Sequence, residues 1–158
     1  MTSPSRRLRR LDMSKHETMT LSDKDKELIA AAAGAIKDRY RNEWQEVGAA
    51  LRTRDGRVIT GVNIDAYIGR IAVCAEAIAV GRAITEGGDK GIETIVAVRH
   101  PKPHEKDQRV KVVSPCGICR ELICDYDPKA RVIVPNGAEP VVTTITELLP
   151  NKYNRGIE

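Results

Sequence analysis

Three cysteines in two short segments constrain this 158-residue chain more than any other feature. Cys74 opens the first segment, and Cys116 and Cys119 form a C-x-x-C pair in the second. Three thiolates can hold one Zn²⁺ and leave its fourth position open for water, which is the pattern of a catalytic zinc site. Glu76 follows the first cysteine by two residues and suits a proton shuttle better than a fourth ligand. The fold must therefore bring segments that are far apart in the chain to a single ion.

Composition and charge indicate one folded domain. Hydrophobic residues make up 41% of the chain and charged residues 30%, as in ordinary globular proteins. The net charge of +4 equals the charge of four arginines within the first ten residues, so the remainder is neutral. A neutral remainder disfavours a basic groove for nucleic acid.

The sequence also bears on the compartment in which the chain works. No apolar run reaches the ~20 residues that span a bilayer. No apolar segment follows the N-terminal arginines as it would in a secretory signal. Four cysteines without such a signal indicate metal binding in a reducing cytoplasm rather than disulfides.

The N-terminal region divides into a tail and a helix. Residues 1–19 carry the arginine cluster, and we predict a disordered basic tail, with an arm that binds nucleic acid or a membrane surface as the weaker alternative. Residues 20–158 then form a single catalytic domain. Ser22 is placed to cap a helix from Asp23 to about Arg41, whose first turn carries acids that the helix dipole favours.

The rest of the chain alternates strands with helices. Helices are predicted from Cys74 to Glu86 and from Cys116 to Tyr126, a helical turn over 146–149, and strands over 47–53, 58–63, 92–98, 131–134 and 141–144, with 110–113 extended. Asp55-Gly56 predicts the turn between the first two strands, and Gly87-Gly88 ends the second helix. This order predicts an α/β fold with a mixed sheet covered by helices on both faces.

All three cysteines fall at predicted helix starts. Helix N-termini carry partial positive charge and free N–H groups, and both lower thiol pKa values, so thiolates are expected there. Three thiolates and a hydroxide exceed the charge of Zn²⁺. Arg120, next to Cys119, is a candidate to offset the excess.

A structural zinc knuckle is the alternative interpretation of the same cysteines. It needs a fourth ligand from His100, His104 or Cys124 and leaves Glu76 without a role, so we favour the catalytic site. Cys124 is expected to be a buried small hydrophobic residue. The two histidines flank prolines and are expected at the surface.

Further motifs occur in order along the chain. They are Val47-Gly48-Ala49-Ala50-Leu51, Gly61-Val62-Asn63, Cys74-Ala75-Glu76, Ala83-Ile84-Thr85-Glu86-Gly87, Ser114-Pro115-Cys116-Gly117-Ile118-Cys119-Arg120-Glu121 and Glu147-Leu148-Leu149-Pro150. Over about residues 25–153 the chain resembles the cytidine deaminase family, and its ending is similar to the branch that includes blasticidin S deaminase. Zinc deaminases share the order Cys or His-x-Glu followed by Pro-Cys-x-x-Cys, with the glutamate as proton shuttle.

The resemblance implies a fold, a cofactor and an assembly. It implies a three-layer α-β-α sandwich with a five-stranded mixed sheet, one zinc per subunit and a homotetramer. Small tetrameric nucleoside deaminases often carry an arginine that hydrogen-bonds the thiolates at the position of Ala77. Its absence leaves charge compensation to Arg120 and the helix ends.

The resemblance also implies substrate contacts. Asn63 and the acid two residues later are expected to grip a ribose 3′-hydroxyl, and that acid is Asp65 where the family usually has glutamate. Ala75, between the ligand and the shuttle, is expected to contact the substrate. The aromatic that packs on the base is replaced by Gln45, and the neighbouring Trp44 is either its substitute or a core or interface residue.

These features favour a zinc hydrolase that deaminates cytidine, deoxycytidine or a related cytosine nucleoside. The nearest alternative is deamination of a cytosine-bearing antibiotic such as blasticidin S, or of another aminated heterocycle. Editing of nucleic acid is disfavoured by the neutral core and an aromatic content of 3%. A non-catalytic, zinc-stabilised binding module is the alternative from a different class.

Overall fold

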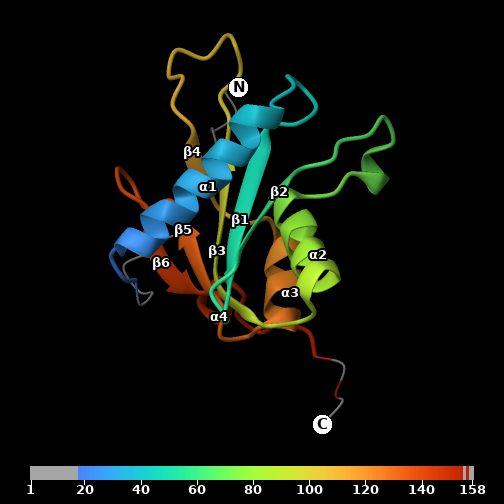
Figure 1. Cartoon of the computed structure of the whole chain (residues 1–158), viewed down its shortest axis with the longest axis vertical. Coiled ribbons are helices and arrows are strands. Elements are labelled where there is room, and N and C mark those ends of the chain that lie inside the picture. The colour runs from blue at the N-terminus through green and yellow to red at the C-terminus, as the bar shows by residue number, and fades with distance from the viewer. Residues whose placement is uncertain (1–17, 155, 157–158) are drawn as a thin grey trace, which may run out of the picture.

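The computed structural model describes residues 18–154 and 156 (Figure 1). Its elements are α1 (Asp23–Arg39), β1 (Val47–Thr53), β2 (Val58–Val62), a 3-10 turn (Gly69–Ile71), α2 (Ala75–Gly87), β3 (Ile92–Arg99), β4 (Lys111–Val113), α3 (Gly117–Tyr126), β5 (Arg131–Val134), β6 (Val141–Thr144) and α4 (Ile145–Leu148). The expected tail lies outside the described residues except for positions 18 and 19. Met19 there pairs with Val142 of β6.

Within the part of the chain that the structure describes, no helix has the length and hydropathy needed to cross a bilayer.

One mixed sheet organises the domain. The strand order is β2-β1-β3-β5-β6, and β4 pairs with β3. β3 and β5 run parallel, whereas every other pair is antiparallel. The predicted α/β class with helices on both faces is confirmed, but the described sheet has six strands where five were expected.

The sixth strand depends on the length of β3. Residues 94–96 of β3 pair with β5, and residues 97–99 pair with β4. β3 thus runs past the end of β5 and leaves a free edge, which the three residues of β4 fill. So short a strand has no alternating pattern of its own, and the sequence therefore indicated only extended chain at this place.

The helices form two layers with the sheet between them (Figure 1). Alternate residues of β1 point to opposite faces of the sheet, as the pleat requires. Ala50 packs with Leu28, Ala32 and Ile36 of α1 in one hydrophobic cluster. Ala49 and Leu51 belong to the other cluster, which is completed by α2, α3 and α4. The second face is the one that carries the cysteines.

The N-terminus of α1 has the predicted cap. The Ser22 side chain accepts a hydrogen bond from the Asp25 backbone N–H, and the Asp25 carboxylate accepts one from Ser22 N, so both halves of a capping box are present. The helix ends at Arg39, two residues earlier than expected. Arg41 instead forms an isolated β-bridge with Gln45. This bridge closes the turn that leads into β1.

Two glycines let helices approach the β1–β2 hairpin from opposite faces. A Cβ atom at Gly48 of β1 would lie 2.5 Å from the Ala32 carbonyl oxygen of α1. A Cβ atom at Gly61 of β2 would lie 2.7 Å from both Ala75 O and Ala79 N of α2. Real Cβ atoms do not tolerate such distances, so α1 and α2 pack directly on hairpin backbone. The close approach of α2 is what fixes the start of that helix, where Cys74 lies.

Candidate metal centre

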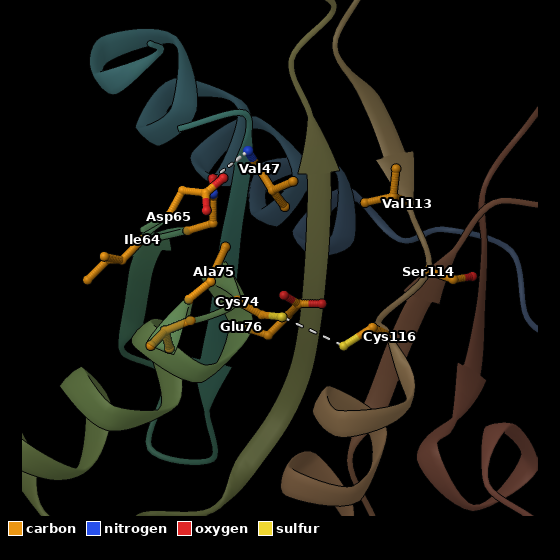
Figure 2. Close-up of a pocket in the computed structure, with 12 residues that line it drawn as sticks. Val47, Ile64, Asp65, Cys74, Ala75, Glu76, Val113, Ser114 and Cys116 are labelled. Atoms are coloured by element: carbon orange, nitrogen blue, oxygen red, sulfur yellow. Dashed lines mark hydrogen bonds between the residues drawn. The ribbon is translucent and has the colours of Figure 1, made fainter. Parts of the chain in front are cut away.

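Two helix starts bring the three cysteine sulfurs together, and Figure 2 shows two of them, Cys74 and Cys116. Cys74 is the N-cap residue of α2, Cys116 is the N-cap residue of α3, and Cys119 lies in the first turn of α3. The Cys74 and Cys116 sulfurs are 3.7 Å apart, and all three Sγ atoms lie within 4.8 Å of one another. α2 and α3 cover the same face of the sheet, and their N-termini meet at one point. The geometry therefore has the convergence that the spacing predicted.

The sulfur positions fit a shared zinc ion. Tetrahedral Zn–S bonds of about 2.3 Å place two ligand sulfurs about 3.8 Å apart, close to the separation between Cys74 and Cys116. Among the described residues, only these three cysteines form such a cluster. His100, His104 and Cys124 do not join it, which disfavours the four-ligand knuckle.

A pocket of about 300 Å³ opens beside the sulfurs (Figure 2). This volume is at the lower end of the range for small-molecule sites. Its lining residues are Val47, Asn63, Ile64, Asp65, Ala72, Val73, Cys74, Ala75, Glu76, Val113, Ser114 and Cys116. An apolar wall with a few polar groups and a thiol cluster at one side is suited to a flat, partly polar ring.

Glu76 lies in the first turn of α2 and is 5% exposed. Burial raises the pKa of its carboxyl group above the usual value, against the opposing hydrogen bonds from its own backbone N–H and from the Cys119 thiol. Glu76 lines the same pocket as Cys74 and Cys116. Glu76 is therefore placed beside the metal position without being needed as a ligand.

The three thiols do not share one electrostatic environment. Burial raises the pKa of Cys74 and of Cys119, and the charge of Glu76 adds to the increase at Cys119. At Cys116 burial acts in the same direction, but hydrogen bonds from Cys119, through its backbone N–H and its thiol, outweigh it and lower the pKa. The expectation that helix starts lower every thiol pKa thus holds for Cys116 alone. Burial, which the sequence does not reveal, decides the other two.

Asn63 anchors the entry of β1. Its side-chain oxygen accepts hydrogen bonds from the backbone N–H groups of Glu46 and Val47, both at 2.9 Å, and its amide nitrogen donates to Trp44 O at 2.7 Å. Asp65 accepts a hydrogen bond from Ala66 N at 2.7 Å. Asn63 and Asp65 both line the pocket.

Trp44 and Gln45 are absent from the residues that line the described pocket. The Trp44 ring lies edge-on to Tyr67, with ring centroids 5.1 Å apart, and the Arg41 guanidinium lies 4.7 Å above it. Val47 of β1 contributes to the pocket wall instead. Ala75, by contrast, lines the pocket, and its contact with the substrate stays a prediction.

Arg120 directs its hydrogen bonds to backbone carbonyls. Its Nε donates to Pro115 O and its Nη1 donates to Leu148 O, both at 3.0 Å. The suggested offset of thiolate charge stays a prediction, and these contacts indicate a different role.

Sequence reasoning missed half of the residues in the pocket wall. Ile64 and Val73 form an isolated β-bridge that folds the loop after β2 against the site, and Val113 comes from β4. No local pattern marks these residues. Ser114 had a signal, because it directly precedes Pro115-Cys116.

Two smaller expectations were tested as well: Cys124 is 8% exposed, as predicted, whereas His100 is half-buried and stacks on Tyr40.

A mixed sheet between two helix layers, with three thiols and a buried glutamate at two helix starts, defines the class of zinc-dependent hydrolases with an open metal position. The family described as "Cytidine and deoxycytidylate deaminase zinc-binding region" matches residues 22–135. The chain belongs to this family.

Individual relatives agree with the family match. Blasticidin-S deaminase from Bacillus cereus is 50% identical over 139 residues, which cover 88% of this chain and 99% of that protein. Cytidine deaminase from Halalkalibacterium halodurans is 31% identical over 130 residues, or 81% of this chain and 89% of the relative. The crystal structure of cytidine deaminase from Burkholderia pseudomallei superposes with a TM-score of 0.65 at 30% identity, covering 84% of this chain and 100% of that one.

Proposed function

We propose that this chain hydrolyses the exocyclic C–N bond of a cytosine ring carried by a nucleoside-like molecule, with release of ammonia. The observation that carries the proposal is that Glu76 lines one pocket together with two members of the cysteine cluster, Cys74 and Cys116. Zinc held by the three thiolates supplies Lewis-acid activation of a water molecule.

Glu76 is the proposed proton carrier. In the net reaction the water oxygen forms a bond to C4 of the ring and becomes the carbonyl oxygen, while the bond from C4 to the amino nitrogen breaks. One hydrogen of the water ends on the ring nitrogen N3, and the other leaves with ammonia. A single carboxylate beside the site can accept each proton and pass it on. Its burial beside the cluster keeps bulk water from taking over this transfer.

Asn63 and Asp65 are the proposed contacts for the sugar-like part of the substrate. A primary amide carries two N–H donors, and one from Asn63 goes to Trp44 O. The second is the donor proposed to reach an oxygen atom of that part, which is a ribose hydroxyl in cytidine. Asp65 is proposed to accept from the same group with its carboxylate, one methylene shorter than the glutamate usual in the family.

Blasticidin S is the substrate we favour over cytidine. The relative named for that activity is 50% identical to this chain, against 31% for the cytidine deaminase described above. The pocket wall also has Val47, Val73 and Val113 and no aromatic ring among its lining residues. Since a stacking ring favours a flat base, its replacement by aliphatic side chains supports a substrate held by contacts beyond the base.

The substrate is tested by incubating the zinc-loaded chain with blasticidin S and with cytidine and following ultraviolet absorbance and ammonia release. We expect turnover of both, with the larger kcat/KM for blasticidin S. A larger value for cytidine would reverse the order of the two candidates. Absence of ammonia release from either would remove the proposed function.

The role of Glu76 is tested by E76Q, with E86Q as its matched control on the same helix. Glu86 is 45% exposed at its side chain and pairs with Arg82 at 2.8 Å. E76Q is expected to lower kcat by at least about 100-fold and to retain zinc, because it removes the proton carrier and no ligand. E86Q is expected to match the parent. Full turnover by E76Q would contradict the role of Glu76 as proton carrier, whereas zinc binding without turnover in the parent chain would support the non-catalytic binding module.

A homotetramer and a cytoplasmic location belong to the same proposal. Tyr67 is 96% exposed, Ile68 65% and Ile71 64%, all in the loop that closes one side of the pocket. Exposed apolar side chains gathered in one loop support burial by another subunit. Light scattering of the purified chain tests this point, with four times the chain mass as the expected value.

A further inference from the structure

The turn that carries Cys116 and Cys119 is packed on one side only, where Pro115 and Cys119 are buried. Cys116, Gly117 and Ile118 are exposed, and Ile118 is 79% exposed. No side chain caps the N-terminus of α3. Packing therefore holds the Cys119 side of the turn, whereas the exposed side, with Cys116, depends on hydrogen bonds.

Arg120 supplies those bonds from three of its nitrogen atoms. Its backbone N–H donates to Cys116 O at 2.9 Å, which closes the first turn of the helix. Its Nε reaches back to the carbonyl of Pro115, the residue directly before the first ligand. The side chain thus spans the whole ligand turn and fixes the backbone at its entry.

The remaining contact joins this turn to a distant part of the chain. Arg120 Nη1 donates to Leu148 O, at the end of α4. The segment that follows is fastened to the same helix further along, because Lys152 pairs with Glu121 at 3.0 Å and with Asp125 at 2.7 Å. The C-terminal segment is therefore held along α3, and Arg120 connects it to the ligands.

We propose that Arg120 is a positioning residue for the metal centre, which holds the Cys116–Cys119 turn in its zinc-binding geometry by bridging the Pro115 and Leu148 carbonyls. This inference rests on the proposed zinc function and adds to it. It differs from compensation of thiolate charge, because it requires the forked, planar guanidinium and not only a positive charge. A lysine has a single nitrogen on a flexible stem and cannot reproduce both contacts in fixed geometry.

The test measures zinc affinity of the full chain by competition with a chromophoric chelator. R120M is expected to weaken zinc binding about 10- to 100-fold, the loss found when partners behind metal ligands are removed. R120K is expected to recover only part of it. The matched control is R82M, because Arg82 on α2 also donates to a backbone carbonyl, Thr60 O, but away from the proposed ligands. R82M is expected to bind zinc as the parent does.

Three results would overturn the inference. The first is a zinc affinity of R120M equal to that of the parent chain. The second is a parental zinc affinity of R120K, because a positive charge alone would then suffice. The third is an equal loss of zinc affinity in R120M and R82M. Thermal unfolding with saturating zinc shows whether R120M folds. If R120M does not fold, the zinc affinity of R120K decides the outcome. Failure of the parent chain to bind zinc would instead contradict the proposed function, so the two failures are distinguishable.

Discussion

The two helices that carry the candidate ligands are held in place in different ways. α2 rests on the backbone of β2, where Gly61 leaves no room for a side chain, and Ala75 in its first turn is completely buried. α3 starts with an exposed turn and is fastened by Arg120 at its beginning, Lys152 along its length and Asp127 at its end. The comparison teaches that close packing sets Cys74, whereas the turn with Cys116 and the buried Cys119 needs polar links in addition to packing.

Removal of a ligand should have the largest effect and tests whether the two helices share an ion. C119A is expected to abolish stoichiometric zinc binding and turnover, because two thiols cannot replace a three-ligand site. C124A is the matched control, since Cys124 is also a buried thiol on α3 but lies outside the cluster. Zinc content after gel filtration measures both. Loss of zinc in both variants would contradict the assignment of the cluster.

The packing side of the comparison is tested at Gly61. G61A is expected to cost about 3 kcal/mol of unfolding free energy, because the added methyl group meets backbone atoms that cannot move alone. G81A is the control within α2, since a Cβ at Gly81 meets nothing within 4 Å, and it should stabilise the helix by about 0.5–1 kcal/mol. Urea unfolding measures both. Equal stabilities would show that α2 does not depend on close packing.

The polar links that hold α3 are tested at Asp127, directly after the helix. Arg54 donates to its carboxylate at 2.7 and 3.0 Å, and the backbone N–H groups of Ile92 and Lys129 donate to it as well. D127N is expected to cost about 2 kcal/mol at neutral pH, because it weakens charge-assisted hydrogen bonds. The exposed D38N should change stability by less than about 0.5 kcal/mol.

The effect of D127N should depend on pH in a defined direction. Burial tends to raise the pKa of Asp127, but hydrogen bonds from Arg54 and the backbone outweigh it and lower the pKa below 3.8. A lowered pKa in the folded state means that the carboxylate contributes stability above about pH 4, and that this contribution is lost as the pH falls through the folded value. The difference between parent and D127N should therefore shrink in acid. A constant difference would exclude this linkage.

The smallest effect is expected at Lys152. Its partners Glu121 and Asp125 have side-chain exposures of 42% and 64%, so solvent screens both ion pairs. K152M should lower the unfolding free energy by less than about 1 kcal/mol and lose this effect in high salt. A larger loss that persists in salt would mean that the C-terminal segment contributes more to α3 than its ion pairs do.

Local chemistry explains what the sequence predicted. Ser22, the Asp55-Gly56 turn and the end of α2 at Gly87 follow from residues that act on their own neighbours. The cysteine cluster followed from ligand chemistry together with two helix starts. The features that the sequence did not predict depend on distant segments. The strand β4 forms only because β3 is long enough to pair with it. Arg120 donates to a carbonyl group 28 positions away. The expected lowering of the thiol pKa was not found at Cys74 and Cys119 for the same reason, since burial is a property of the folded chain.

Gly48 and Gly61 have a consequence for the whole molecule. They lie on adjacent strands of one hairpin and receive α1 and α2 on its opposite faces, each in direct contact with backbone. Only the backbone of the hairpin therefore separates α1 from α2 at these two positions, so a shift of one helix affects the other across the sheet. A larger residue at position 48 would face α1 on the opposite side of the sheet from the pocket, yet its neighbour Val47 lines the pocket, so displacing α1 would also disturb the metal site.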